Sequence, residues 1–259
     1  MRKLIAAAVL GLACLPVAVS QAAVTVYAQY NLGEAGSLAG AENLPQDSVG
    51  GHNFTNAFGS STVTATGGAV NNGAYVTTGQ YSGWIGTNAF STLPTDNVGY
   101  GIWVKATNTG DQGPVTAVGS MGIDLIDSWA PSIYYVDFFG SPATFTADTW
   151  THLAMIRQNG TTTFYANGVA QGAPTTLAFN PDSYSTPGLA MDPKYDGTDP
   201  ANQGIFFQGG MDDFRVVSFS GTDSTASILN SLTAPVPEPT SLGLLLTAGV
   251  LMSRRSRKA

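Results

Sequence analysis

The sequence predicts an all-β fold, a sandwich of two antiparallel sheets, from three observations. Glycine and proline occur 31 and 14 times among 259 residues, as expected for many short strands joined by turns. β-Branched and aromatic residues alternate with other residues in several short segments, which is the period of a strand. Two Asn-Gly pairs join such segments, and this pair favours a tight hairpin turn because both residues tolerate positive φ.

The strand-like segments follow one another through the middle of the chain. They cover residues 24–30, 98–106, 132–139, 150–158, 161–166 and 211–219. Asn159-Gly160 and Asn167-Gly168 lie between consecutive segments and predict three antiparallel strands in a row. We expect Trp103 and Trp150 to lie in the core because both belong to strand segments. One short helix is expected at 225–232, with Asp223 or Ser224 as its N-terminal cap.

Composition and charge exclude several classes of protein. The chain is 43% hydrophobic and only 10% charged, which is too apolar for a disordered protein. Residues 23–233 contain sixteen acidic and four basic residues, a net charge of −12. A surface this acidic repels phosphate backbones, so no nucleic-acid partner is expected.

The N-terminus has the pattern of a secretory signal peptide. Arg2 and Lys3 precede an apolar run of twelve residues, 4–15, which is too short to span a bilayer. Small residues before the expected cut place cleavage by signal peptidase between Ala22 and Ala23. Residues 1–22 are therefore expected to be removed during export across the inner membrane.

The C-terminus carries a second pattern, in residues 234–259. A prolyl motif, an apolar run over 240–253 and a basic stop follow one another. The motif consists of Val236, Pro237, Glu238 and Pro239, and the basic stop of Arg254, Arg255, Arg257 and Lys258. The apolar run predicts a short hydrophobic helix, and the basic residues would hold its end in the cytoplasm. Fourteen residues fall short of the ~20 of a stable span, which favours transient membrane insertion.

This arrangement resembles the PEP-CTERM sorting signal of Gram-negative bacteria. The resemblance rests on the order of the Pro-Glu-Pro motif, the apolar run and the arginine cluster. It implies a membrane-bound precursor, processing by an exosortase near the motif, and delivery to the cell surface or to an extracellular exopolysaccharide matrix.

The segment between the two signals, 23–233, resembles laminin-G-like domains over residues 24–232. The resemblance is carried by five segments: 30–34 (YNLGE), 101–105 (GIWVK), 150–154 (WTHLA), 164–168 (FYANG) and 210–216 (GMDDFRV). It implies a concanavalin A-like jelly roll with two antiparallel sheets packed face to face. It also implies that His152 packs within its strand. One of Asp212 and Asp213 is expected to bond a neighbouring loop.

No catalytic residues are predicted, and the chain is expected not to be an enzyme. Glucanases of the related fold place two carboxylates on one strand as Glu-x-Asp-x-x-Glu, one as proton donor and one as nucleophile. Here Glu34, Glu42 and Glu238 are the only glutamates, and none lies in that pattern.

Calcium is the one cofactor that the sequence suggests. Residues 180–202 contain four aspartates, and a hard cation prefers several oxygen ligands. Asp192, Asp196 and Asp199 are the candidate ligands, with Asp182 nearby. Laminin-G-like domains often bind calcium at the rim of the sandwich. The alternative is a solvated acidic loop with turn-forming aspartates.

The predicted function is non-catalytic binding of exopolysaccharide, surface glycans or protein partners. Sugar binding needs aromatic platforms with a few polar groups. Trp84 and Trp129 lie in irregular stretches and are the candidate exposed platforms, with Tyr134 as a companion. Two alternatives remain open: a polysaccharide-active hydrolase on the same scaffold, and a structural matrix component with no discrete ligand.

Overall fold

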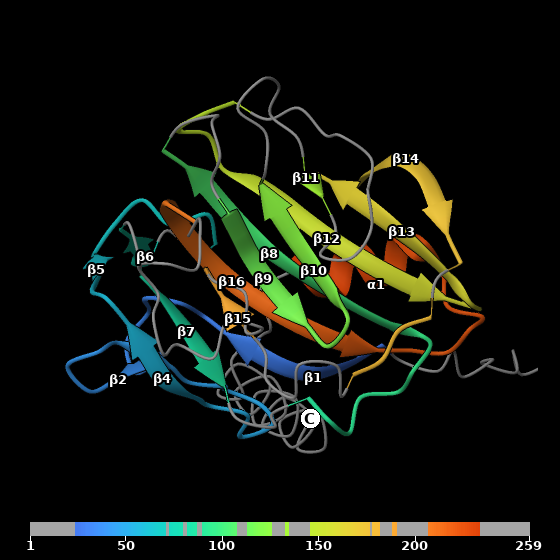
Figure 1. Cartoon of the computed structure of the whole chain (residues 1–259), viewed down its shortest axis with the longest axis horizontal. Helices are drawn as coiled ribbons and strands as arrows, with labels where there is room; N and C mark the ends of the chain where they lie inside the picture. Colours follow the sequence, from blue (N-terminus) through green and yellow to red (C-terminus); the bar gives the residue numbers. More distant parts are fainter. Residues whose placement is uncertain are drawn as a thin grey trace, which may run out of the picture.

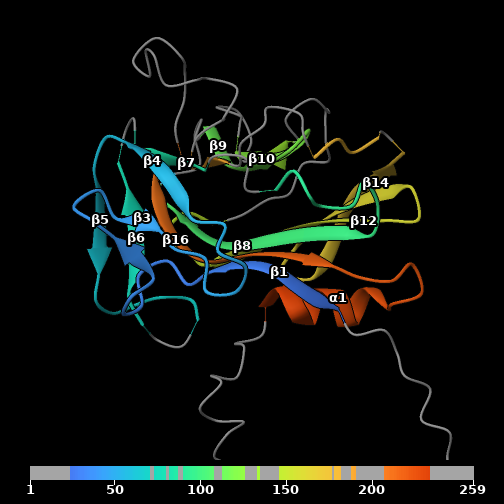
Figure 2. The same ribbon diagram turned by 90° about the horizontal axis from the view of Figure 1, so that it is seen from below.

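Two antiparallel sheets lie face to face, and a helix covers the outer side of the larger sheet (Figures 1 and 2). The computed structural model describes residues 24–70, 73–79, 82–86, 90–107, 113–125, 133–134, 146–176, 178–181, 188–190 and 207–233. The sandwich predicted from the sequence is confirmed. No helix within these residues is long and apolar enough to cross a membrane.

The larger sheet has eight strands in the order β14-β13-β12-β8-β16-β6-β5, with β1 also paired to β16. Its strands are β1 (Thr25–Tyr30), β5 (Ser61–Thr64), β6 (Tyr75–Thr78), β8 (Val98–Ala106), β12 (Thr151–Gln158), β13 (Thr161–Ala166), β14 (Val169–Thr175) and β16 (Gly209–Ser218). Every pairing is antiparallel. The centre of this sheet is formed by the segments that show the clearest strand pattern in the sequence.

The smaller sheet has six strands in the order β11-β10-β9-β15-β7-β4. Its strands are β4 (Phe54–Phe58), β7 (Gly83–Gly86), β9 (Gly113–Val118), β10 (Met121–Leu125), β11 (Ile133–Tyr134) and β15 (Gly188–Leu189). β2 (Leu38–Ala39) and β3 (Leu44–Pro45) pair with each other. Of the strand expected at 132–139, the structure describes only the two residues of β11.

The two hairpin turns have the expected geometry. Asn159 and Gly160 have φ of +50° and +78°, and Asn167 and Gly168 have +48° and +77°. Positive φ at both central residues is the type I′ turn, whose twist matches that of the flanking strands. The three consecutive strands β12, β13 and β14 are therefore joined as predicted.

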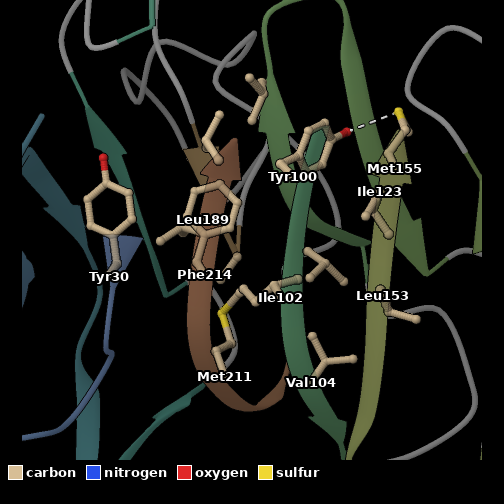
Figure 3. Packing of buried hydrophobic residues seen from close by; sticks show 14 of the residues in the cluster. Tyr30, Tyr100, Ile102, Val104, Ile123, Leu153, Met155, Leu189, Met211 and Phe214 are labelled. Carbon is tan, nitrogen blue, oxygen red and sulfur yellow. Dashed lines mark hydrogen bonds between the residues drawn. The ribbon is translucent and has the colours of Figure 1, made fainter. Parts of the chain in front are cut away.

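The main core fills the space between the two sheets. On β8 the residues at even positions, Val98, Tyr100, Ile102 and Val104, are at most 2% exposed, because alternate residues of a strand point to the same face. Figure 3 shows Tyr100 beside Met155 of β12, and the tyrosine hydroxyl donates a hydrogen bond to the sulfur at 3.3 Å. Phe214 of β16 stacks on Tyr30 of β1.

The other face of the larger sheet, here called the outer face, carries a second core beneath α1 (Thr225–Thr233). Ile228 and Leu232 of the helix are fully buried against Ala154, Ile156 and Val217. Ser224 caps the helix, since its hydroxyl accepts a hydrogen bond from the Ser227 N–H at 3.1 Å. Figure 2 shows the helix against this face, opposite the smaller sheet.

Candidate functional site

Two groups of polar side chains lie on the outer face, and the first is a carboxylate cluster of Glu34, Asp212 and Asp213. Strand β16 changes partner along its length, pairing with β6 up to Met211 and with β1 from Phe214 onward. The two aspartates lie between these pairings, at an irregularity in the register with β8. Asp213 has a φ of +47°, which an aspartate tolerates better than most residues.

Loop segments close over the cluster. Asp212 is fully buried, and its Oδ2 accepts hydrogen bonds from the N–H groups of Ala69 at 2.7 Å and Val70 at 3.0 Å. This confirms the expected bond from the final-strand aspartates to a neighbouring loop. The other oxygen of Asp212 and both carboxylate oxygens of Glu34 are buried without a hydrogen-bonding partner among the described residues.

Two glycines allow this loop to lie so close to the carboxylates. A Cβ on Gly68 would lie 2.9 Å from Oδ2 of Asp212, and one on Gly73 would lie 2.6 Å from Oε1 of Glu34. The Gly68 N–H also donates to the Gly73 carbonyl at 3.1 Å. Larger residues at these two positions would have to push the carboxylates aside.

Arg215 is the cation of this region. It is 1% exposed, and its Nε donates to Oδ1 of Asp213 at 2.9 Å, while a terminal nitrogen lies 2.8 Å from Oδ2. Its other terminal nitrogen donates to the Ser231 carbonyl at 3.2 Å, in the last turn of α1, where positive charge is favourable. The arginine therefore links the cluster to the helix.

All three carboxyl groups of the cluster have raised pKa values. Burial, with a smaller contribution from nearby Asp213, raises the pKa of Glu34 to about 7. Burial likewise raises the pKa of Asp212 to about 7, with repulsion from Glu34 and Asp213 adding to the effect. The pKa of Asp213 rises to about 6 through burial, against the lowering effect of Arg215. Three carboxyl groups beside one arginine thus share protons near neutral pH.

Asp212→Asn should therefore gain stability relative to the parent as the pH rises from about 5 to about 8. The folded domain keeps the proton of Asp212 up to about pH 7, whereas the unfolded chain loses it near 3.8. The stability that Asp212 contributes is fully present below its pKa in the unfolded chain, 3.8. It is lost as the pH rises through its pKa in the folded domain, about 7. Removing the charge should recover roughly 1–3 kcal/mol at the higher pH, measured by urea unfolding at each pH.

Asp47 offers a matched control, because its pKa in the folded domain is lowered rather than raised. Burial would raise its pKa, but hydrogen bonds from the N–H groups of Gln29, His52 and Val49, among others, outweigh burial and lower it. Asp47→Asn should therefore be less stable than the parent across the same pH range. An Asp212→Asn variant that loses stability relative to the parent as the pH rises would contradict our account of the cluster.

The second group lines a cleft, here called the α1 cleft, between the helix and strands β8 and β12. The cleft has a volume of about 440 Å³, within the usual range of ligand sites. It is lined by Trp103, His152, Asn167, Gly168, Ala226, Leu229, Asn230 and Thr233. Trp103 and His152 are directly opposite each other on β8 and β12, and their ring centres are 5.2 Å apart.

The polar groups of the α1 cleft are uncharged at neutral pH. His152 is 1% exposed, and its pKa is lowered to about 4, mainly by burial. The Leu232 carbonyl raises this pKa, and the positive charge of Arg215 lowers it. The indole Nε1 of Trp103 is buried without a hydrogen-bonding partner among the described residues. The ring of His152 packs on Gly101, where a Cβ would lie 2.9 Å from Nε2. His152 thus has the packing role expected from the sequence.

The expectation of an exposed Trp84 was wrong. Trp84 lies on β7, between β15 and β4 in the smaller sheet, is 1% exposed, and belongs to the main core. Its Nε1 donates to the Glu42 carbonyl at 3.3 Å. Its side chain faces the larger sheet rather than solvent, so it offers no surface for a ligand.

The two tryptophans expected in the core are only partly buried. Trp150 precedes β12 rather than belonging to it, and its Nε1 donates to the Gly67 carbonyl at 3.0 Å. Its ring meets Tyr75 edge to face. Trp103 is on the outer face of β8, because its neighbours Ile102 and Val104 point into the core. The strand period was correct, but it does not reveal which face of a strand is fully covered.

Several predicted residues lie outside the part of the chain that the structure describes. They are Trp129, Asp182, Asp192, Asp196 and Asp199, together with Ala22, Ala23 and the C-terminal residues 234–259. Tyr134 is in β11, and nothing further is described of its side chain. Within the described ranges, no group of three or more histidine, cysteine, aspartate or glutamate side chains is arranged to hold a metal ion.

Comparison with known proteins places the chain in a family. Residues 71–225 match Laminin_G_3, described as the concanavalin A-like lectin/glucanases superfamily. Among curated proteins, a sequence comparison finds no significant match.

Solved structures of the same fold are distant in sequence. Domain 4 of AbnA, a GH43 extracellular arabinanase from Geobacillus stearothermophilus solved with arabinotriose, is 17% identical with a TM-score of 0.54, and the match covers 81% of this chain and 98% of that domain. A Trypanosoma rangeli sialidase mutant displaying trans-sialidase activity is 12% identical with a TM-score of 0.51, covering 78% of this chain and 32% of the sialidase.

At these identities the structural likeness establishes the fold alone. The family match extends over more than half of the chain and includes all of β8, β12 and β16. The chain therefore belongs to the concanavalin A-like lectin/glucanases superfamily.

Proposed function

We propose that this protein is an exported, non-catalytic surface or extracellular-matrix protein whose sandwich domain binds carbohydrate. The observation that carries the proposal is the α1 cleft, in which an indole and several uncharged hydrogen-bonding groups line one concave site. Sugars bind in such sites because their C–H faces lie against aromatic rings while their hydroxyl groups form hydrogen bonds. Membership of the lectin/glucanase superfamily supports this ligand class.

Binding to polysaccharide tests the proposal directly. The purified chain should bind at least one soluble polysaccharide, with arabino-oligosaccharides, glucans and exopolysaccharide as probes in calorimetric titration. The titration is run in excess calcium and again in excess chelator. The calcium site that we propose at Asp192, Asp196 and Asp199 predicts weaker binding or a lower melting temperature with chelator. Binding to none of these probes would favour the structural alternative with no discrete ligand.

We propose that the domain does not hydrolyse its ligand. The clustered carboxyl groups of Glu34, Asp212 and Asp213 are the described candidates for paired acid and nucleophile, and none of them lines the α1 cleft. Gly68 and Gly73 lie directly against two of them. Incubation with the bound polysaccharide should release no new reducing ends. Release that is abolished in Glu34→Gln or Asp212→Asn would instead support the hydrolase alternative.

The proposed route to the cell surface rests on the terminal motifs of the sequence. We propose export by signal peptidase processing at Ala22–Ala23, transient membrane insertion, and cleavage by an exosortase near Val236–Pro239. Replacing Pro237, Glu238 and Pro239 by alanine should leave an unprocessed precursor in the membrane fraction of the Gram-negative host, detected by immunoblotting. Normal maturation of that variant would exclude the motif as the sorting signal.

A further inference from the structure

We propose that the α1 cleft selects an uncharged sugar unit, seated on the indole of Trp103, and rejects acidic sugars. This inference rests on the proposed carbohydrate binding and adds a location and a ligand class to it. Three features of the described residues support it: the shape of the cleft, the polar groups in its lining, and the charge beside it.

The cleft has a rigid floor and two different walls. Trp103 and His152 form the floor, on paired positions of the two central strands β8 and β12. One wall is the turn at Asn167. The backbone N–H of His152 donates a hydrogen bond to the side-chain oxygen of Asn167 at 2.9 Å, and the backbone N–H of Asn167 donates to the His152 carbonyl at 2.8 Å. The other wall is α1, which contributes Leu229 and Asn230 among others. A site built on paired strands and a bonded turn is preorganised for a ligand.

The polar groups in the lining match sugar hydroxyl groups. The Nε1 of Trp103 is a buried donor without an acceptor among the described residues. Leaving such a donor unbonded is costly, so a ligand oxygen that meets it when the indole turns toward the cleft would be favoured. Asn230 is exposed on α1 and offers a second amide at the rim. Donors and acceptors that carry no formal charge recognise hydroxyl groups and do not compensate a carboxylate.

The charge around the cleft disfavours an anionic ligand. No lysine or arginine is among the described residues that line it, and its histidine is neutral at neutral pH. Asp212 of the carboxylate cluster is directly opposite Trp103 on the neighbouring strand. Arg215, the cation of that strand, is paired with Asp213. A uronic or sialic acid in the cleft would therefore lose hydration of its carboxylate without a charged partner among the described lining residues, whereas a neutral hexose or pentose carries no such group.

The test compares a neutral glucan or arabinan with polygalacturonate on the full chain, using calorimetry and the indole N–H resonances of tryptophan. The neutral glycan should bind, and binding should shift the indole N–H signal of Trp103 but not that of Trp150. Trp103→Phe, which keeps an aromatic ring and removes the donor, should weaken binding at least tenfold. Trp150→Phe is the matched control, because the Trp150 N–H is already bonded to Gly67 outside the cleft, and it should bind like the parent.

A second pair of variants tests the location without touching the floor. Ala226 is exposed and lines the cleft, so Ala226→Trp should fill it and abolish binding. Ser227, the next residue, is exposed and is not part of the lining, so Ser227→Trp should leave binding intact. Both variants should keep the parent's melting temperature because both residues are exposed.

The possible outcomes separate this inference from the function on which it rests. Glycan binding that survives both Trp103→Phe and Ala226→Trp would place the sugar elsewhere and overturn the inference while leaving carbohydrate binding intact. Polygalacturonate binding within tenfold of the neutral glycan would overturn the selectivity for uncharged sugar. A parent chain that binds neither class would remove the proposed function and this inference together.

Discussion

Arg215→Met should destabilise the domain by about 3–5 kcal/mol, the usual cost of leaving one buried partner of an ion pair unpaired. Asp213 is 2% exposed and would lose its ion-pair partner, while repulsion between Asp213 and the carboxylates of Glu34 and Asp212 would remain. The Ser231 carbonyl in the last turn of α1 would also lose its donor. Guanidinium unfolding near pH 8 is the measurement, because the three carboxyl groups are mostly ionised there.

Two companion variants show whether the lost ion pair is the cause. Arg215→Met combined with Asp213→Asn removes both charges and should recover much of the loss, since Asn also tolerates the positive φ of this position. Arg157→Met removes another buried arginine, but its carboxylate partner Asp96 is 37% exposed and stays hydrated, so the loss should be smaller. Equal losses in all three variants would indicate that lost packing, rather than charge, destabilises the domain.

Trp84→Ala should destabilise the domain by about 3–5 kcal/mol, as expected for a large aromatic side chain removed from a packed core. Trp84 is 1% exposed, and its strand β7 lies between β15 and β4 in the smaller sheet. The melting temperature should fall by roughly 10 °C or more, while the folded fraction should bind carbohydrate like the parent.

Val169→Ala provides the control for this prediction. Val169 is an apolar residue that is 63% exposed, so truncating it should change stability by less than about 0.5 kcal/mol. A Trp84→Ala variant that melts like the parent but loses carbohydrate binding would show that Trp84 forms a ligand platform and that the core has been assigned wrongly.

Local chemistry made the strands and turns predictable. The alternation in 98–106 and the Asn-Gly pairs are properties of a few adjacent residues, and they define β8 and the β12–β13–β14 hairpins without reference to the rest of the chain. The cap of α1 is local for the same reason, because Ser224 reaches only as far as Ser227. The bond from Asp212 to a distant loop was also expected, but through the resemblance of 210–216 to laminin-G-like domains.

Burial was less predictable than secondary structure, as the tryptophans show. A strand pattern places Trp103 on one face of β8, yet only the position of α1 determines how far that face is covered. Trp84 lies in an irregular glycine-containing stretch, and the packing of the smaller sheet against the larger one buries it. Trp150 lies next to a strong strand, but the fold places it beside Tyr75 at the surface.

The sequence alone was enough to predict the fold class and the hairpins, because the strand and turn patterns depend on residues within a short span. The carboxylate cluster and the α1 cleft depend on contacts between distant segments. Glu34 lies beside Asp212 only because β16 pairs with β6 before this point and with β1 after it. Trp103 and Asn230 line the same cleft only because α1 packs against the outer face of the larger sheet. Strand order and helix position are set by the packing of the whole core, which no local pattern encodes.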